Sequence, residues 1–152
     1  DWSSDVYSSD LAHNCDNIIG VKEASGDMSQ IMKIIKGKPE NFDVLSGDDM
    51  LTLPVIAAGG SGVISVLANA FPAAVTELVN NALRNNLKSA REIQFRYLEM
   101  IDLLFAEGNP AGVKAMLNVL NISSNHLRLP LVPVSRPTMT RIQKAIEEVS
   151  KA

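Results

Sequence analysis

The stretch that decides the fold of this chain is Asn-Ile-Ile-Gly-Val-Lys-Glu-Ala-Ser-Gly-Asp, residues 17–27. Its apolar residues Ile18, Ile19 and Val21 are β-branched and almost continuous, a pattern typical of a strand that is covered on both faces of a parallel sheet. The apolar run ends on a single lysine, Lys22, and then breaks into a turn before a helix. The stretch therefore predicts a buried strand with one cationic side chain near its carboxyl end.

Strand and helix patterns alternate along the chain that follows. The predicted order is a helix over 28–37 with Asp27 as its cap, a strand over 42–46, a helix over 49–58 and a strand over 62–66. Pro54 has no N–H to donate, so it must lie in the opening turn of its helix or at a kink. Because strands and helices alternate at this spacing, the strands must pair in parallel through right-handed crossovers. The sequence thus predicts an α/β fold.

From Pro72 onward the strand patterns stop. Helices are predicted over 72–82, 90–107, 113–120 and 142–149, with Gly108 ending the long second one. The stretch Leu129–Pro137 holds three prolines and is predicted to be an extended connector rather than a strand. Residues 1–10 give a weak pattern, either a turn or a frayed helix start, with 11–15 finishing a helix.

Composition excludes several classes of function. Hydrophobic residues make up 46% of the 152 residues and charged residues 20%, with a formal net charge of -3, so neither nucleic acid nor an anionic membrane is expected as a partner. The single cysteine, Cys15, excludes an internal disulfide and favours a reducing cytosol. No stretch has the length and apolarity of a transmembrane helix, and nothing indicates secretion.

Lys22 allows two interpretations. Burial destabilises an ammonium ion relative to the neutral amine, and a neutral amine is a nucleophile. Alternatively, the aliphatic stem lies on apolar surface while the charged end reaches water. Spacing by itself favours the second interpretation, because chemically perturbed lysines are a minority.

Three motifs carry a resemblance to a known family. They are Val-Lys-Glu-Ala-Ser-Gly-Asp at 21–27, Leu-Ser-Gly-Asp-Asp at 45–49 and Gly-Gly-Ser-Gly-Val-Ile-Ser-Val at 59–66. In this order they resemble the dihydrodipicolinate synthases, which belong to the pyruvate-dependent class I aldolases. The resemblance runs from Leu11 to Val149 and covers only the later half of that family's barrel. It implies about three βα units of a TIM (β/α)8 barrel within residues 1–86, followed by an α-helical C-terminal appendage over 87–152.

The resemblance also implies a chemistry. The lysine matching Lys22 forms a Schiff base with pyruvate, and the resulting enamine attacks aspartate 4-semialdehyde in lysine biosynthesis. Gly47 and Ile64 match substrate-binding positions, the first beside the pyruvate and the second through its carbonyl and side chain. No cofactor is implied, and the complete enzyme is expected to be a cytoplasmic homotetramer. Two alternatives stay open, namely another pyruvate-dependent aldolase such as N-acetylneuraminate lyase and a non-catalytic fragment that acts as an assembly unit.

Two further motifs have a structural interpretation beside the functional one. Asp48 and Asp49 directly follow a predicted strand, where they could act in catalysis or close a turn that caps the next helix. No histidine or cysteine stands at ligand spacing near them, so no metal site is predicted. The glycines at 59–62 lack the lysine and Ser/Thr of a P-loop and lead into a strand, so a simple glycine turn is predicted.

Overall fold

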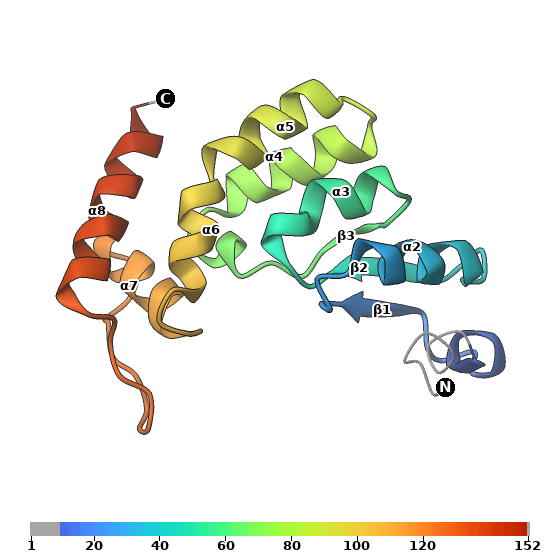
Figure 1. Ribbon diagram of the computed structural model, residues 1–152, viewed down its shortest axis with the longest axis horizontal. Coiled ribbons are helices and arrows are strands. Elements are labelled where there is room, and N and C mark those ends of the chain that lie inside the picture. The colour runs from blue at the N-terminus through green and yellow to red at the C-terminus, as the bar shows by residue number, and fades with distance from the viewer. Residues whose placement is uncertain (1–9, 152) are drawn as a thin grey trace. The chain divides into compact units, whose positions relative to one another are not determined.

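The computed structural model describes residues 10–151 of the chain (Figure 1). Its elements in order are β1 Gly20–Glu23, α2 Met28–Gly37, β2 Asp43–Ser46, the 3-10 helix η1 Asp49–Leu51, α3 Thr52–Ala57, β3 Gly62–Val63, the 3-10 helix η2 Leu67–Asn69, α4 Pro72–Leu83, α5 Leu87–Arg96, α6 Leu98–Phe105, α7 Ala111–Val119 and α8 Arg136–Ser150. Residues 10–14 are helical, and most of the prediction for 1–10 falls outside the described residues.

Contacts within the chain gather into two compact units. The first takes in the described residues up to Ser65 together with Val79–Ala90, and the second takes in Val66–Leu78 and the described residues from Arg91 onward. The boundary between the units falls inside both α4 and α5. The domain boundary expected at residues 86 and 87 concerns the complete barrel and stays a prediction.

The first unit contains a three-stranded parallel sheet in the order β1-β2-β3. Lys22 pairs with Leu45 of β2, and Leu45 pairs in turn with Gly62 of β3. The predicted parallel order is therefore confirmed. The third strand is shorter than the predicted 62–66, because β2 turns away after Ser46 and leaves the residues after Val63 without a continuing partner strand.

Helices α2 and α3 belong to the same unit as the sheet and cover one face of it (Figure 1). On that face the completely buried Val44 packs in one cluster with Ile34 of α2 and with Phe42. As predicted, Asp27 caps α2, since its carboxylate accepts the N–H groups of Ser29 and Gln30. The opposite face carries Lys22 and Ile64, both of which are exposed.

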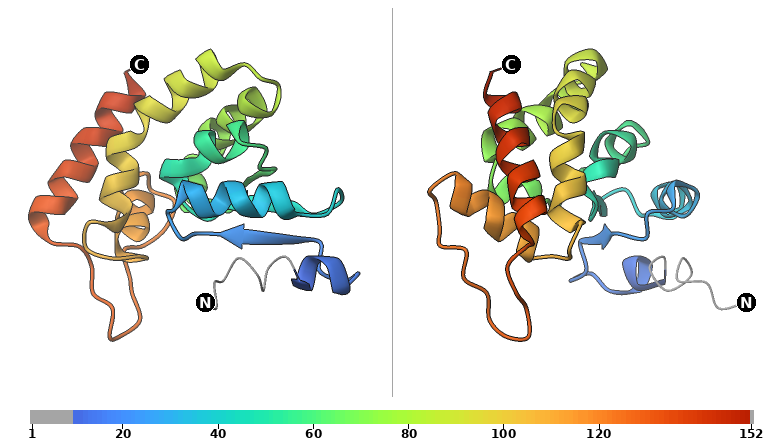
Figure 2. Two further views of the ribbon diagram at one scale, coloured as in Figure 1. Left: turned by 45° about the vertical axis from the view of Figure 1, so that its right-hand side comes forward. Right: turned by 60° about the vertical axis from the view of Figure 1, so that its left-hand side comes forward.

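In the second unit, α6, α7 and α8 contact one another pairwise and η2 contacts both α6 and α7 (Figure 2). The predicted single helix over 90–107 is wrong, because the chain breaks at Tyr97 into α5 and α6. The Tyr97 N–H donates to the Gln94 carbonyl, three residues back, so the turn tightens there. The centroid of the buried Tyr97 ring lies 5.2 Å from the centroid of the Phe71 ring, and this packing favours a break at Tyr97 over one straight helix.

The last helix begins with a cap that reaches back along the chain. Its N-cap residue Ser135 accepts the Thr138 N–H and donates its own N–H and O–H to the Glu107 carboxylate at 2.8 and 2.6 Å. The connector before it contains no strand within the described residues, as predicted. The helix starts at Arg136, earlier than the sequence pattern suggested, because Pro137 is accepted in its first turn.

The hydrogen bonds between Glu107 and Ser135 should make the stability of the protein depend on pH in the acid range. The side-chain hydrogen bonds from Ser135 and Thr138 and the backbone hydrogen bond from Ser135 hold the pKa of Glu107 below its usual value. A carboxyl whose folded pKa is depressed contributes stability above its unfolded pKa of about 4.3, and this contribution is lost as the pH falls through the folded pKa. In Glu107→Gln the thermal unfolding midpoint should therefore decrease less steeply as the pH falls below about 4.3. The matched control is Glu92→Gln, which changes an exposed glutamate. An unchanged pH dependence in Glu107→Gln would contradict this role.

Candidate functional site

The three residues singled out from the sequence lie in the first unit, near the carboxyl ends of its strands. Lys22 is the third residue of β1, Gly47 directly follows β2, and Ile64 directly follows β3. Lys22, Leu45 and Gly62 are paired in one row, so their side-chain positions share a face of the sheet. Ile64 stands two residues beyond Gly62 and therefore points to the same face, which is the face that α2 and α3 leave open.

Gly47 makes room for the lysine. Its N–H donates to the Glu23 carbonyl at 2.6 Å and thereby continues the β1–β2 ladder past Ser46. A Cβ at this position would lie 2.9 Å from Lys22 Cε and 2.5 Å from the Ala24 methyl group. Glycine is thus the residue that lets the strand end pass directly beside the lysine side chain.

Lys22 is exposed, as in the second of the two interpretations that the sequence left open, in which the charged end reaches water. The reason is that no helix of the first unit, within the described residues, covers the face on which it lies. Ile64 on the same face is 48% exposed. In this chain the Lys22 side chain therefore lacks the apolar cover that would desolvate an amine.

Polar side chains fix the turn that follows β2. The Ser46 hydroxyl is completely buried, donates to the Asp48 carbonyl at 2.8 Å and accepts the Asp48 N–H at 3.2 Å. The Asp48 carboxylate accepts the Met50 N–H at 2.8 Å, so the capping interpretation of this residue is confirmed. Neither Ser46 nor its hydrogen bonds were singled out from the sequence, although the residue stands within the motif at 45–49.

A second polar contact joins this turn to the chain after β3. Asp49 is buried, and its carboxylate accepts the hydroxyl hydrogen of Ser65. The Asp49 carbonyl accepts the Thr52 hydroxyl hydrogen at 3.0 Å in the same turn. These bonds hold the segment that carries Ile64 against the end of β2.

The glycines at 59–62 have the structural role that the sequence predicted. Gly59 has a φ of +105°, which few other residues adopt, and a Cβ on Gly60 would lie 2.6 Å from Val55 Cγ1. The Ser61 N–H donates to the Val44 carbonyl at 2.9 Å and leads the chain into β3. The turn is shaped by close backbone packing.

Other kinds of site find little support within residues 10–151. No group of three His, Cys, Asp or Glu side chains there is placed to hold a metal ion. No helix in that range combines the length and apolarity needed to cross a bilayer. His13 and His126 are both exposed.

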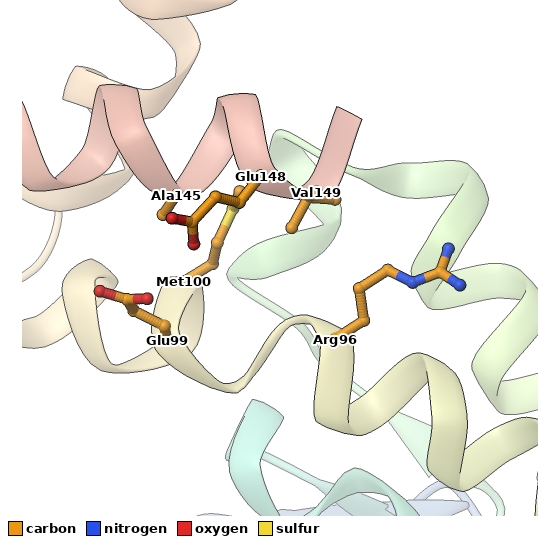
Figure 3. Close-up of a pocket in the computed structure, with 6 residues that line it drawn as sticks. All are labelled: Arg96, Glu99, Met100, Ala145, Glu148 and Val149. Carbon is orange, nitrogen blue, oxygen red and sulfur yellow. The ribbon is translucent and has the colours of Figure 1, made fainter. Parts of the chain in front are cut away.

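The second unit contains an open cavity of about 220 Å³ between α6, α8 and the end of α5. Figure 3 shows its lining residues, Arg96, Glu99, Met100, Ala145, Glu148 and Val149. The Arg96 guanidinium points away from both carboxylates in this view. Glu99 and Glu148 are exposed and form surface ion pairs with Arg141 at 3.9 Å and Lys144 at 3.7 Å. The polar groups of this cavity do not converge, so the carboxyl ends of the strands remain the candidate site.

Comparisons with known proteins find relatives in both sequence and structure. The model of the Dihydrodipicolinate synthetase family matches residues 8–149. The 4-hydroxy-tetrahydrodipicolinate synthase of Phocaeicola vulgatus is 48% identical over 139 residues, which cover 91% of this chain and 47% of the relative. Among solved structures, the dihydrodipicolinate synthase of Aquifex aeolicus superimposes with a TM-score of 0.93 at 37% identity, over 97% of this chain and 50% of the other.

A further solved relative carries a ligand. The dihydrodipicolinate synthase of Acinetobacter baumannii, crystallised in complex with pyruvate, superimposes with a TM-score of 0.89 at 29% identity, over 97% of this chain and 50% of the other. The chain thus spans about half the length of the relatives that it matches. Its three βα units and the following helices have the fold of part of a TIM barrel with a helical C-terminal region, as the sequence predicted.

Proposed function

The chain belongs to the dihydrodipicolinate synthetase family, and from this premise we propose that it supplies the lysine-bearing half of an enzyme that condenses pyruvate with aspartate 4-semialdehyde. The relatives that it matches are named 4-hydroxy-tetrahydrodipicolinate synthase at 43–51% identity. The reaction belongs to lysine and diaminopimelate biosynthesis. The enzyme is a lyase that needs no cofactor or metal ion, and it works in the cytoplasm as a homotetramer.

The observation that carries the proposal is the convergence of Lys22, Gly47 and Ile64. Three segments that are far apart in the sequence bring a lysine amine, a glycine and an acceptor carbonyl to one edge of the sheet. The carboxyl ends of the strands are where barrel enzymes place their reacting groups. Gly47, which has no Cβ, lets the chain after β2 pass directly beside the Lys22 side chain.

In the proposed reaction the Lys22 amine adds to the keto carbon of pyruvate. The carbonyl electron pair moves to oxygen, which gains a proton as nitrogen loses one. The hydroxyl of the resulting carbinolamine then takes up a second proton and leaves as water, which gives a protonated imine. Loss of a methyl proton gives the enamine, whose carbon attacks the aldehyde carbon of aspartate 4-semialdehyde. The aldehyde electron pair moves to its oxygen, which takes up a proton, and the imine on Lys22 is formed again. Hydrolysis of the imine then releases the product and restores the amine.

The exposed face around Lys22 is consistent with a half barrel. The lysine needs a drier environment than this chain supplies, because a charged ammonium is not a nucleophile. We infer that the remaining strands of the complete barrel close over this face and supply that environment. The division into barrel residues 1–86 and appendage residues 87–152 belongs to the same proposal.

The test is a comparison of substrates on the complete enzyme that carries this sequence. We expect pyruvate-dependent consumption of aspartate 4-semialdehyde and no cleavage of N-acetylneuraminate. Cleavage of N-acetylneuraminate with no condensation would replace the synthase by the sibling lyase. Failure of both reactions, with the complementary half bound, would favour a non-catalytic assembly unit.

Replacing Gly47 tests the site geometry. In Gly47→Ala the new methyl group must displace Lys22 Cε or the Ala24 methyl group, because both lie within 3.0 Å of its position. A misplacement of about 1 Å can cost about 100-fold in rate, so imine formation with pyruvate should slow by roughly that factor. The matched control is Gly37→Ala, whose Cβ would meet nothing within 4 Å. Equal rates in the two variants would show that Gly47 does not shape the lysine site.

A further inference from the structure

The hydrogen-bond ladder between β2 and β3 stops one bond short of the candidate site. The Ile64 N–H donates to the Ser46 carbonyl at 2.8 Å. In a parallel ladder the next bond would run from the Asp48 N–H to the Ile64 carbonyl. The reason is that only every second residue along β2 directs its backbone N–H and C=O groups toward β3. The Asp48 N–H donates instead to the hydroxyl oxygen of its own neighbour, Ser46, at 3.2 Å.

This diversion leaves the Ile64 carbonyl available. Within residues 10–151 no donor is bonded to it, although the backbone on both sides is held. On one side the Ile64 N–H is bonded to β2, and on the other the Ser65 hydroxyl is bonded to the buried Asp49 carboxylate. The carbonyl is therefore a hydrogen-bond acceptor that is held in place near the carboxyl ends of the strands, where Lys22 also lies.

We propose that Ser46 is a positioning residue. Its hydroxyl oxygen accepts the Asp48 N–H, so that the Ile64 carbonyl stays available to accept a hydrogen bond from the intermediate formed on Lys22. This inference rests on the proposed function. The Ser46 hydroxyl is completely buried, and its two bonds to Asp48 are the structural means of this diversion. Without the hydroxyl, the Asp48 N–H needs another acceptor, and the Ile64 carbonyl occupies the ladder position beside it.

The carbonyl discriminates between pyruvate and the intermediate. Free pyruvate offers only acceptor oxygens, namely its carboxylate and its keto group. The Ile64 carbonyl, which the resemblance assigns to substrate binding, can therefore accept a hydrogen bond only after pyruvate has reacted. After the Lys22 amine has added to the keto carbon, the former keto oxygen is a hydroxyl and can donate. A bond that forms only after addition raises the rate of the chemical step and leaves the initial binding of pyruvate unchanged.

The experiment measures imine formation on the complete enzyme by rapid mixing with pyruvate and quenching with borohydride. In Ser46→Ala the limiting rate should fall about tenfold, as expected for the loss of one hydrogen bond to the intermediate, while the pyruvate concentration at half the limiting rate stays the same. Ser46→Thr keeps the hydroxyl and should restore the rate. Ser61→Ala is the matched control, since it removes a hydroxyl at the amino end of β3 that is bonded to Asp43.

Several outcomes would overturn the proposal. A wild-type limiting rate in folded Ser46→Ala would do so, and so would a rise in the half-saturating pyruvate concentration at an unchanged limiting rate. If the alanine variant does not fold, Ser46→Cys provides the test, because a thiol fills the site but accepts hydrogen bonds weakly. A wild-type rate in that variant would equally overturn the role of Ser46. A wild-type enzyme that forms no Lys22 adduct at all would instead refute the proposed function.

Discussion

Lys22→Ala is expected to abolish covalent reaction with pyruvate while leaving the protein folded. The amine is the nucleophile of the proposed reaction, so without it no imine and no enamine can form. In this chain the side chain packs against little, and in the closed barrel an amine is costly to desolvate, so its removal should cost little stability. Condensing activity and the thermal unfolding midpoint of the complete enzyme should be measured together, and only the activity should be lost.

Two further lysine variants show that this loss is specific. Lys22→Arg keeps the positive charge but removes the amine, and it should be as inactive as Lys22→Ala. Lys36→Ala removes an exposed lysine from α2 and should behave as the wild type. A Lys22→Ala variant that condenses pyruvate near the wild-type rate would remove Lys22 from the mechanism.

The isolated 152-residue chain is expected not to persist as a compact monomer in solution. The sheet has helices of its own unit on one face, and both outer strands lack a second neighbour in the described part of the chain. If the open face exposes roughly 400 Å² of apolar surface, at about 25 cal/mol per Å² the burial that is lost amounts to about 10 kcal/mol. That is comparable with the whole stability of a domain. We therefore expect self-association, or a complex with the complementary half.

Sedimentation tests this expectation. Association should be visible as a mass above 16.4 kDa, and addition of the separately produced complementary half should convert it into one defined complex. A matched variant is Ile64→Ser, which makes the open face less apolar and should weaken self-association. A stable 16.4 kDa monomer with cooperative unfolding would mean that the chain covers this face by itself.

Much of the first unit could be predicted from the sequence, because its signals are local. β-branched residues before Lys22 marked β1, and Asp27 marked the start of α2 through a capping bond that depends only on neighbouring residues. Once the strands are parallel, their register places Lys22 and Ile64 on the same face. The order of the three strands followed from the alternation of strands and helices.

The features that were missed depend on packing between distant residues. No glycine or proline near Tyr97 predicts the break between α5 and α6. The break lies where the tyrosine ring packs near Phe71. The early end of β3 follows from the turn of β2 after Ser46, which a strand pattern over 62–66 does not reveal. The sequence left open whether Lys22 is buried or reaches water, because that depends on what covers its face of the sheet, and such a cover is absent from the described part of this chain.

Lys22 is the residue that we propose bonds covalently to pyruvate. The most direct measurement is to treat the complete enzyme with pyruvate and borohydride, digest it, and locate the reduced adduct by mass spectrometry. We expect one adduct, on the peptide containing Lys22, and no adduct when pyruvate is left out. An adduct on a different lysine, or no adduct in an enzyme that still condenses its substrates, would contradict the assignment of Lys22.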